Sequence, residues 1–367
     1  MKMTDRDTYI RHISFLNKAT SQYKDFAFFA SLRKPMFLLL LALCSFLLSV
    51  QSPLSAQAAG QRYLVLIGGL GGTPEHKERF QNYLQETRAA FIDRFQFPTE
   101  NILTLAAPPT DKVDFADGAA KADIISAEFG KLAASLTDQD DVFIILFGHG
   151  SFDGKNAMLN IPRRDLKDFD YGSLIATLKA RRMVFINTAS CSGPFIKQLS
   201  AKNRMIITAT KSGRQRVDTH FPKFLIEAFQ DDAADLNKNG DLDMLEVFKF
   251  ASKSVENYFT ENNLIPTENA LLEDTGDGKG LRLAELDAAA EGGLASSIIL
   301  RGGTLLTTLS NDPAATGLLA EKQQVEEKIR VVQAAKSTLS ETAYFAKLEP
   351  LFIELALIND KLENNTN

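Results

Sequence analysis

The stretch VFIILFGHGS, residues 142–151, decides the fold class of this 367-residue chain. Its six consecutive apolar residues, 142–147, fit a strand that is buried on both faces, as strands of parallel sheets are. Gly148, His149 and Gly150 follow that strand directly. Because functional sites of open α/β sheets lie beyond the carboxyl ends of the strands, the histidine stands where a functional group is expected.

Other short apolar runs lie on both sides of this strand and alternate with amphipathic segments. We expect strands at residues 63–67, 101–105, 183–186 and 204–209, and helices at residues 80–91, 116–136, 171–180, 221–229 and 245–259. This alternation predicts an α/β fold with a mostly parallel sheet. A polar stretch around Pro313 precedes residues 314–367, whose apolar spacing predicts a C-terminal helical hairpin.

The N-terminal part of the chain has the features of an export signal. An apolar run at residues 36–50 follows two basic residues and precedes Ala56-Gln57-Ala58, the small-x-small pattern that signal peptidase requires. We therefore expect residues 1–58 to be a signal peptide and the mature protein to be periplasmic or secreted. A retained membrane anchor through residues 36–50 is the alternative, although this run is short for a bilayer span.

The charge balance argues against one class of partner. The whole chain has a net charge of −5, and removal of residues 1–58 takes away seven basic and three acidic residues, which leaves −9. No basic stripe with interleaved aromatic residues accompanies this acidic balance, so we expect no nucleic-acid partner. We also expect no organic cofactor, because the glycines of residues 68–72 lack both the phosphate-loop and the Rossmann pattern.

Cys191 is the one thiol of the predicted mature chain, since Cys44 lies within the signal peptide. An unpaired thiol is unusual in an exported protein and suggests reactivity, whereas a small buried apolar residue is the alternative interpretation. Cys191 follows the apolar strand at 183–186, and Pro194 suits the first turn of a helix. A helix N-terminus and a nearby imidazole, such as that of His149, would both favour the thiolate.

The two strand ends together resemble a known family. Apolar strand–His-Gly-Ser and, about forty residues later, apolar strand–Ala-Ser-Cys are similar to the caspase-fold cysteine peptidases, and most similar to the legumain-like peptidase family C13, which includes exported bacterial members. The resemblance covers about residues 61–280. It implies a caspase-like three-layer sandwich within residues 59–310 and a cysteine endopeptidase that works through a thioester, with transpeptidation as an open side activity.

The resemblance also implies roles for individual residues. Cys191 corresponds to the nucleophile and His149 to the general acid and base. The backbone N–H groups of Gly150 and Cys191 correspond to the oxyanion hole. Peptides or proteins are the implied substrates.

A pocket for the substrate side chain is implied around Glu75, His76 and Ser212. If Glu75 lines this pocket, a basic residue before the scissile bond would be preferred over Asn; a solvated glutamate at a helix start is the alternative. Thr73 is a candidate for a third catalytic member. Legumain has an acidic residue two positions before its catalytic cysteine, where this chain has Ala189.

Residues 235–246, DLNKNGDLDMLE, fit the calcium-binding loop of an EF-hand. Oxygen ligands fall at the required loop positions, and Gly240 stands at the sharp turn. The predicted ligand residues are Asp235, Asn237, Asn239, Asp241, Asp243 and Glu246. We therefore predict a structural Ca²⁺ site, with an Asx-rich turn as the alternative. The acidic run at residues 273–280 is shorter and is interpreted as a tight turn.

The sequence is compatible with two functions of different classes. The first is an exported cysteine endopeptidase with a structural calcium ion. The second is a catalytically weak or inactive binding or scaffold protein on the same fold. In the second case residues 314–367 would supply the surface for a protein partner.

Overall fold

The computed structural model describes residues 60–107, 114–288 and 292–300, short helical pieces between residues 317 and 332, and residues 339–364. The predicted signal peptide at residues 1–58, together with the alternative membrane anchor, lies outside the described residues. Among the described helices, none is long and apolar enough to cross a bilayer.

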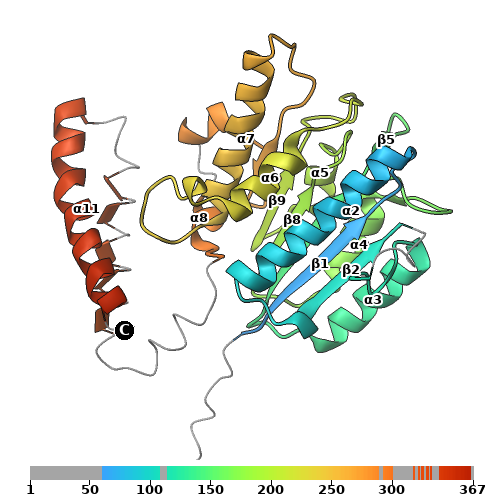
Figure 1. Ribbon diagram of the computed structural model, residues 1–367, viewed down its shortest axis with the longest axis horizontal. Coiled ribbons are helices and arrows are strands. Elements are labelled where there is room, and N and C mark those ends of the chain that lie inside the picture. The colour runs from blue at the N-terminus through green and yellow to red at the C-terminus, as the bar shows by residue number, and fades with distance from the viewer. Residues whose placement is uncertain are drawn as a thin grey trace, which may run out of the picture. The chain divides into compact units, whose positions relative to one another are not determined.

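A seven-stranded sheet forms the centre of the described fold (Figure 1). Its strands run in the order β10-β9-β8-β4-β1-β2-β3. Every neighbouring pair is parallel except the edge pair of β10 and β9. The strand bounds are β1 Arg62–Gly68, β2 Ile102–Ala106, β3 Gly118–Ala119, β4 Asp141–Phe147, β8 Arg182–Asn187, β9 Arg204–Thr208 and β10 Leu271–Glu273. The sequence prediction of an α/β fold with a mostly parallel sheet is confirmed.

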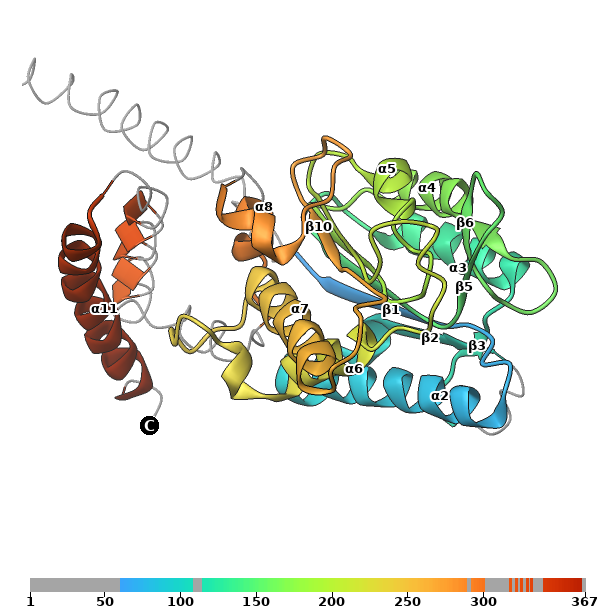
Figure 2. The same ribbon diagram turned by 90° about the horizontal axis from the view of Figure 1, so that it is seen from above.

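Helices cover both faces of this sheet and make it a three-layer sandwich (Figure 2). The helices α2, α6 and α7 lie on one face, and α3, α4 and α5 lie on the other. Their bounds are α2 Pro74–Ala89, α3 Ala122–Ser135, α4 Asp168–Ala176, α5 Phe195–Leu199, α6 Phe221–Gln230 and α7 Met244–Glu261. This arrangement is consistent with the caspase-like sandwich expected from the motifs.

The alternation of side chains along the strands creates two separate cores. On β1, Leu64 and Leu66 point into the core shared with α2, α6 and α7. Val65 and Ile67 point into the core shared with α3, α4 and α5. All four side chains are buried, as a strand covered on both faces requires. The apolar run on β4 divides between the two cores in the same way.

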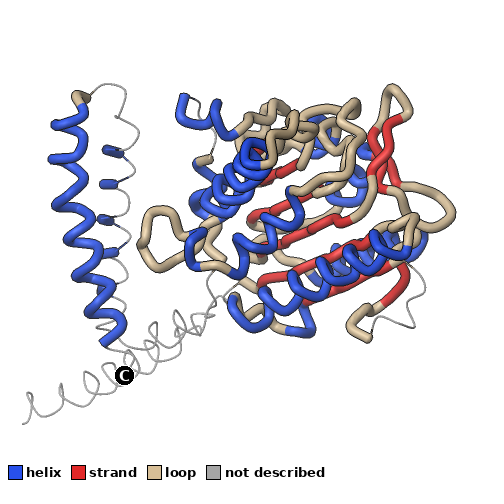
Figure 3. Tube along the Cα trace, turned by 45° about the horizontal axis from the view of Figure 1, so that its top comes forward, coloured by secondary structure: helices blue, strands red, loops and turns tan. Residues whose placement is uncertain are grey.

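Several elements differ from the sequence prediction. The helix expected from residue 116 begins at Ala122, because residues 118 and 119 pair with β2 as the short edge strand β3. A small antiparallel sheet of β5 Gly150–Phe152, β6 Ala157–Leu159 and β7 Leu166–Lys167 was not anticipated (Figure 3). Its strands have two or three residues each, too few for the alternating pattern that identifies strands in a sequence.

Short helical segments complete the sandwich. They are the π-helical η1 Ala90–Arg94, the 3-10 segments η2 Thr99–Asn101, η4 Asp232–Ala234 and η5 Leu283–Ala288, and helix α8 Gly293–Ser297. Buried Asp274 accepts hydrogen bonds from the backbone N–H groups of Gly292 and Ala295, at 2.8 Å each, and so fixes the start of α8.

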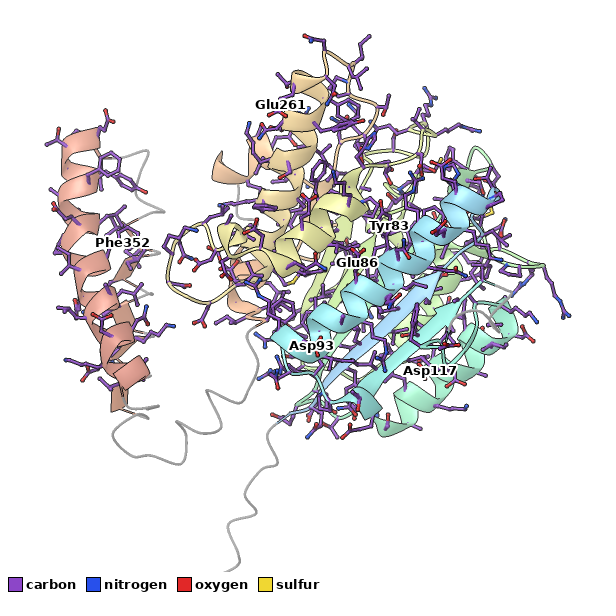
Figure 4. The ribbon with its side chains drawn as sticks, viewed as in Figure 1. Tyr83, Glu86, Asp93, Asp117, Glu261 and Phe352 are labelled. Atoms are coloured by element: carbon purple, nitrogen blue, oxygen red, sulfur yellow. The ribbon has the colours of Figure 1, made fainter. Side chains whose placement is uncertain are left out.

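The C-terminal region contains the long helix α11, Glu341–Asn364, which carries Phe352 (Figure 4). Residues 317–332 include described helical pieces whose Val325 and Ile329 pack with Leu348 and Leu355 of α11. These contacts form a small apolar cluster of their own. The prediction of helices in residues 314–367 is confirmed for the described part.

Candidate active site

The two sequence motifs meet at the carboxyl edge of the central sheet. Strands β4 and β8 are parallel neighbours, with Leu146 opposite Asn187, so the segments that follow them leave the sheet side by side. His149 belongs to the first segment and Cys191 to the second. Strand β1 lies on the other side of β4, and the chain changes direction across the sheet between these two strands. Such a switch point is the usual location of a site in an open α/β sheet.

The Ser190 hydroxyl links the two motifs directly. Its Oγ accepts a hydrogen bond from the Gly150 N–H at 3.2 Å and donates one to the Gly150 carbonyl at 3.1 Å. A side chain at position 150 would place its Cβ 1.9 Å from the Ser190 carbonyl oxygen. Only glycine permits this approach of the two backbones. Ser190 therefore holds the segment of His149 against the segment of Cys191.

Cys191 lies in a strained and covered turn. Its φ angle is +58°, in the left-handed region that residues with a side chain rarely occupy. Such strain persists only when the surroundings enforce it, and it is concentrated at functional sites. The side chain is 1% exposed. Burial raises the pKa of the Cys191 thiol, and the positive charge of Arg216 and the nearby Ser190 hydroxyl partly offset that effect.

Residues 211–217, called the 211–217 loop below, cover this turn. The Cys191 N–H donates a hydrogen bond to the Gln215 carbonyl at 2.8 Å. The Gln215 side chain donates to Asn269 Oδ1 at 3.0 Å, and Arg216 donates to the Phe152 carbonyl at 3.1 Å. The loop is therefore anchored at three points, one of which is the backbone of Cys191 itself.

Both N–H groups of the predicted oxyanion hole have partners in this arrangement. The Gly150 N–H is bonded to Ser190 Oγ, and the Cys191 N–H is bonded to the Gln215 carbonyl. An oxyanion would have to replace these two acceptors. The carbonyl of Gln215 thus occupies a place in which a substrate oxygen would compete with it.

His149 is held by groups from two other segments. Its Nε2 lies 3.1 Å from the Gly71 carbonyl oxygen, and its Nδ1 lies 3.6 Å from Asp218 Oδ1. Its ring packs against that of Phe80, with 5.1 Å between the centroids. In the part of the chain that the structure describes, no hydrogen bond joins this imidazole to the Cys191 thiol.

Asp218 is the functional candidate that the sequence analysis missed. Besides facing His149, its carboxylate forms an ion pair with Arg79 and lies 3.3 Å from Nε2 of His76. Asp218 stands in the polar segment after β9, between that strand and α6. The rule that places sites at carboxyl strand ends covers this segment too, and Asp218 is its single acidic residue, so a signal for it was present in the sequence.

The predicted pocket residues have different surroundings. His76 lies beside His149, with ring centroids 4.7 Å apart. Glu75 is exposed in the first turn of α2. Ser212 is half-buried in the 211–217 loop, where its Oγ accepts from the Arg214 N–H at 3.3 Å. Thr73, the candidate third catalytic member, is the N-cap of α2, and its Oγ1 lies 2.7 Å from Nδ1 of His76 rather than at His149.

The loop at residues 235–246 folds with many side chain to backbone hydrogen bonds. The Asp235 carboxylate accepts from the N–H groups of Asn239 and Gly240, at 3.2 and 2.9 Å. Gly240 has a φ of +82°, as its place at the sharp turn requires. Asp243 and Glu246 form a capping box at the start of α7.

The acidic groups of this loop are partly removed from water. Burial raises the pKa of Asp243 to about 7, the nearby Glu246 adds to this, and burial raises the pKa of Glu246 as well. Asp241 forms an ion pair with Lys322 at 2.5 Å, and Asn359 of α11 donates to the Asn239 carbonyl at 3.0 Å. The C-terminal helical region thus contacts the loop. The remaining predicted ligand, Asn237, accepts from the Asn239 N–H at 2.9 Å.

Part of the chain matches a known protein family. Residues 120–256 match the model of the Peptidase C13 family. This match confirms the resemblance that the sequence motifs indicate. The matched range includes both His149 and Cys191. Strand β1 and helix α2 lie before this range in the sequence.

No curated protein matches the chain. Among solved structures, protein GSU0716 from Geobacter sulfurreducens is similar over 58% of this chain and 92% of its own, with 12% identity and a TM-score of 0.39.

Proposed function

We propose that this protein is an exported cysteine endopeptidase of the legumain type, with Cys191 as its nucleophile and His149 as its general acid and base. The match to the Peptidase C13 family supports a legumain-like cysteine peptidase acting on peptides or proteins. One observation carries the residue assignment. The Ser190 hydroxyl accepts a hydrogen bond from the Gly150 N–H and donates one to the Gly150 carbonyl, and so joins the two motif segments at adjacent strand ends.

The proposed reaction needs a change at the site before it begins. A substrate segment displaces the Gln215 carbonyl from the Cys191 N–H, which uncovers the thiol. The His149 imidazole takes the thiol proton, and the thiolate sulfur attacks the carbonyl carbon of the scissile bond. The N–H groups of Cys191 and Gly150 stabilise the oxyanion once their present acceptors have moved.

The remaining steps follow from this proton balance. The imidazolium of His149 gives its proton to the leaving amine as the C–N bond breaks, which leaves a thioester on Cys191. Water then attacks the thioester, with His149 as base, and releases the acid and the thiol. An amine in place of water would give transpeptidation. In this scheme Asp218 fills the third catalytic place, because its carboxylate stabilises the imidazolium that forms in both halves of the reaction.

A peptide carrying an electrophilic group tests the assignment. We expect it to label wild-type protein, to leave Cys191→Ala unlabelled, and to label His149→Ala at least tenfold more slowly. A small alkylating agent of similar intrinsic reactivity provides the control, because it lacks the peptide that opens the 211–217 loop. If the peptide probe reacts no faster than the small agent, the peptidase assignment fails and the scaffold function is favoured.

We also propose that the 235–246 loop binds a structural Ca²⁺ ion. The six predicted ligand residues supply only oxygen donors, which Ca²⁺ prefers. The loop backbone also fits, because Gly240 takes a φ of +82° at the sharp turn that an EF-hand loop requires.

Export rests on the sequence of residues 1–58 alone. We propose cleavage after Ala58 and a periplasmic or secreted mature protein. N-terminal sequencing of protein recovered from the exported fraction tests this. A chain that still contains residues 36–50 and sediments with membranes would favour the anchored alternative.

One observation keeps the scaffold function as the second candidate. Helix α11 has an apolar side that packs on residues 325 and 329, yet Phe345, Ile353 and Leu357 of the same helix are 55–58% exposed. Large exposed apolar side chains on one helix are compatible with a protein partner. The labelling experiment above separates the two functions, because a scaffold needs no reactive thiol.

A further inference from the structure

Three side chains at the edge of the site could together hold a metal ion. His76, His149 and Asp218 each offer one ligand atom, and these three atoms lie within 4.8 Å of one another. The Asp218 carboxylate lies 3.3 Å from Nε2 of His76 and 3.6 Å from Nδ1 of His149. All three side chains are about one-quarter to one-third exposed, so an ion could reach them from solvent.

The hydrogen bonds of His149 show which of its nitrogens is free to ligate. Its Nε2 faces the Gly71 carbonyl, which can only accept, so Nε2 must carry a hydrogen. In the neutral ring, Nδ1 then presents its lone pair to the Asp218 carboxylate; catalysis requires the other tautomer, with the hydrogen on Nδ1 and the lone pair on Nε2. A cation between these two groups would stabilise this arrangement, as Arg79 already does for the other oxygen of the carboxylate.

The hydrogen bond between Thr73 and His76 likewise leaves one nitrogen of the His76 ring free to bind a metal ion. Its Nδ1 lies 2.7 Å from Thr73 Oγ1, which can accept the Nδ1 hydrogen and leave the Nε2 lone pair directed at Asp218. Histidines that bind metals nearly always donate their second N–H to an oxygen of this kind, which fixes the orientation of the ring. Gly71 and Thr73 therefore serve as the outer partners that such a site needs.

The types of ligand atom fit one metal better than others. Tetrahedral Zn²⁺, with bonds of about 2.0–2.2 Å, places its ligand atoms roughly 3.3–3.6 Å apart, so the three side chains, whose ligand atoms lie within 4.8 Å, would draw closer together around the ion. Two imidazoles and one carboxylate suit Zn²⁺, whereas Ca²⁺ prefers a shell of oxygens. Arg79, which also contacts Asp218, holds the carboxylate in place but lowers the affinity for a dication.

We propose that His76, His149 and Asp218 form a Zn²⁺ site that inhibits the enzyme by binding the imidazole of its general base. The inhibitory part of this proposal rests on the proposed peptidase function; the binding part does not. The site would thus make the peptidase responsive to free zinc.

Metal binding is tested first, on the mature chain with Ca²⁺ in excess so that the 235–246 loop stays filled. We expect one equivalent of Zn²⁺ to bind, and His76→Ala and Asp218→Asn each to weaken it at least tenfold. His220→Gln, the matched control because this ring packs on Tyr258 and Phe259 rather than in the cluster, should bind as wild type does. Equal binding by wild type and His76→Ala would overturn the proposal.

Co²⁺ in place of Zn²⁺ identifies the ligands by absorption. Four-coordinate Co²⁺ bound to nitrogen and oxygen gives visible bands without the intense thiolate-to-metal band that a cysteine ligand adds. We expect the same spectrum from wild type and Cys191→Ala. A thiolate band that disappears in Cys191→Ala would show that the thiol binds the ion, and would overturn the proposed ligand set.

The inhibitory effect is measured with the peptide probe. Zn²⁺ should slow labelling of wild type at least tenfold, and a chelator selective for zinc over calcium should restore it. The labelling rate of each protein is compared with its own rate without zinc. For His76→Ala, labelling should slow only at higher Zn²⁺ concentrations than for wild type. If Zn²⁺ binds but labelling is unchanged or faster, the inhibitory role is wrong. If wild type is not labelled even without metal, the peptidase function fails while the Co²⁺ spectrum still decides the site.

Discussion

The backbone N–H of Cys191 donates a hydrogen bond to the carbonyl oxygen of Gln215 at 2.8 Å. This bond closes the 211–217 loop over the thiol and occupies a donor that the proposed mechanism needs. The loop is anchored at one further point by Asn269 and at another by the Phe152 carbonyl. Access to Cys191 therefore depends on how firmly a surface loop is held, and this can be changed without altering the reacting groups.

Loosening the loop should expose the thiol. In Asn269→Ala the Gln215 side chain loses its acceptor, so we expect a small alkylating agent to label Cys191 several-fold faster than in wild type. Asn262→Ala, which removes a single exposed hydrogen bond at the end of α7, is the matched control and should leave the rate unchanged. Identical rates in all three proteins would show that this anchor does not limit access to Cys191.

Removing the Ser190 hydroxyl should weaken the link between the two motifs. Ser190→Ala loses both hydrogen bonds to Gly150, and we expect the free energy of unfolding to fall by about 1–2 kcal/mol. Because the segment of His149 is then held less firmly against that of Cys191, peptide-probe labelling should fall about tenfold. Ser173→Ala, on the exposed side of α4, is the control.

The outcome for Ser190→Ala separates two roles. A loss of stability without slower labelling would mean that the hydroxyl only supports the fold. Slower labelling with unchanged stability would point to direct participation in the reaction. The prediction requires both effects together.

Reactivity of the thiol should depend on pH in a direction set by burial. Burial raises the pKa of Cys191, so near neutral pH the wild type holds less thiolate than a free cysteine. The rate of alkylation should rise with pH and reach half of its plateau above the midpoint for free cysteine. Arg216 lowers the pKa of Cys191, so Arg216→Gln should move the midpoint higher still, while Arg216→Lys should keep it near wild type.

The plateau of the same profile provides the internal control. Arg216 also anchors the 211–217 loop through the Phe152 carbonyl. A looser loop raises the plateau rate, whereas a lost positive charge moves the midpoint. A midpoint for Arg216→Gln at or below that of wild type would contradict the electrostatic role of Arg216.

The parts of the fold that were predictable are those in which one local pattern decides the structure. Residues 142–147 are buried on both faces because β4 lies at the middle of a covered sheet, and this gives an unbroken apolar run. The strand-end rule then placed His149 and Cys191 on one edge. Pro194 indeed precedes a helix, although α5 has only five residues.

The rest depends on contacts between distant segments. Asp218 reaches His149 across 69 positions in the chain. The bond between Cys191 and Gln215 is made by backbone atoms, which leave no trace in residue identity. Glu75, by contrast, has the charge expected of a pocket residue but is exposed in the first turn of α2, two residues after the N-cap Thr73.

Calcium should stabilise the protein through the 235–246 loop. At about one hundred times its dissociation constant, a ligand that binds only the folded state adds about 2.7 kcal/mol to the free energy of unfolding. For a domain of this size we expect the melting temperature to rise by roughly 5–10 °C. Asp235→Asn removes a ligand charge and keeps an acceptor oxygen for only one of the N–H groups of residues 239 and 240, so the rise, measured against the variant's own calcium-free melting temperature, should shrink strongly. Asp277→Asn, in the exposed turn at residues 273–280, should keep the full rise, and an equal loss in both variants would assign the effect to general charge rather than to this loop.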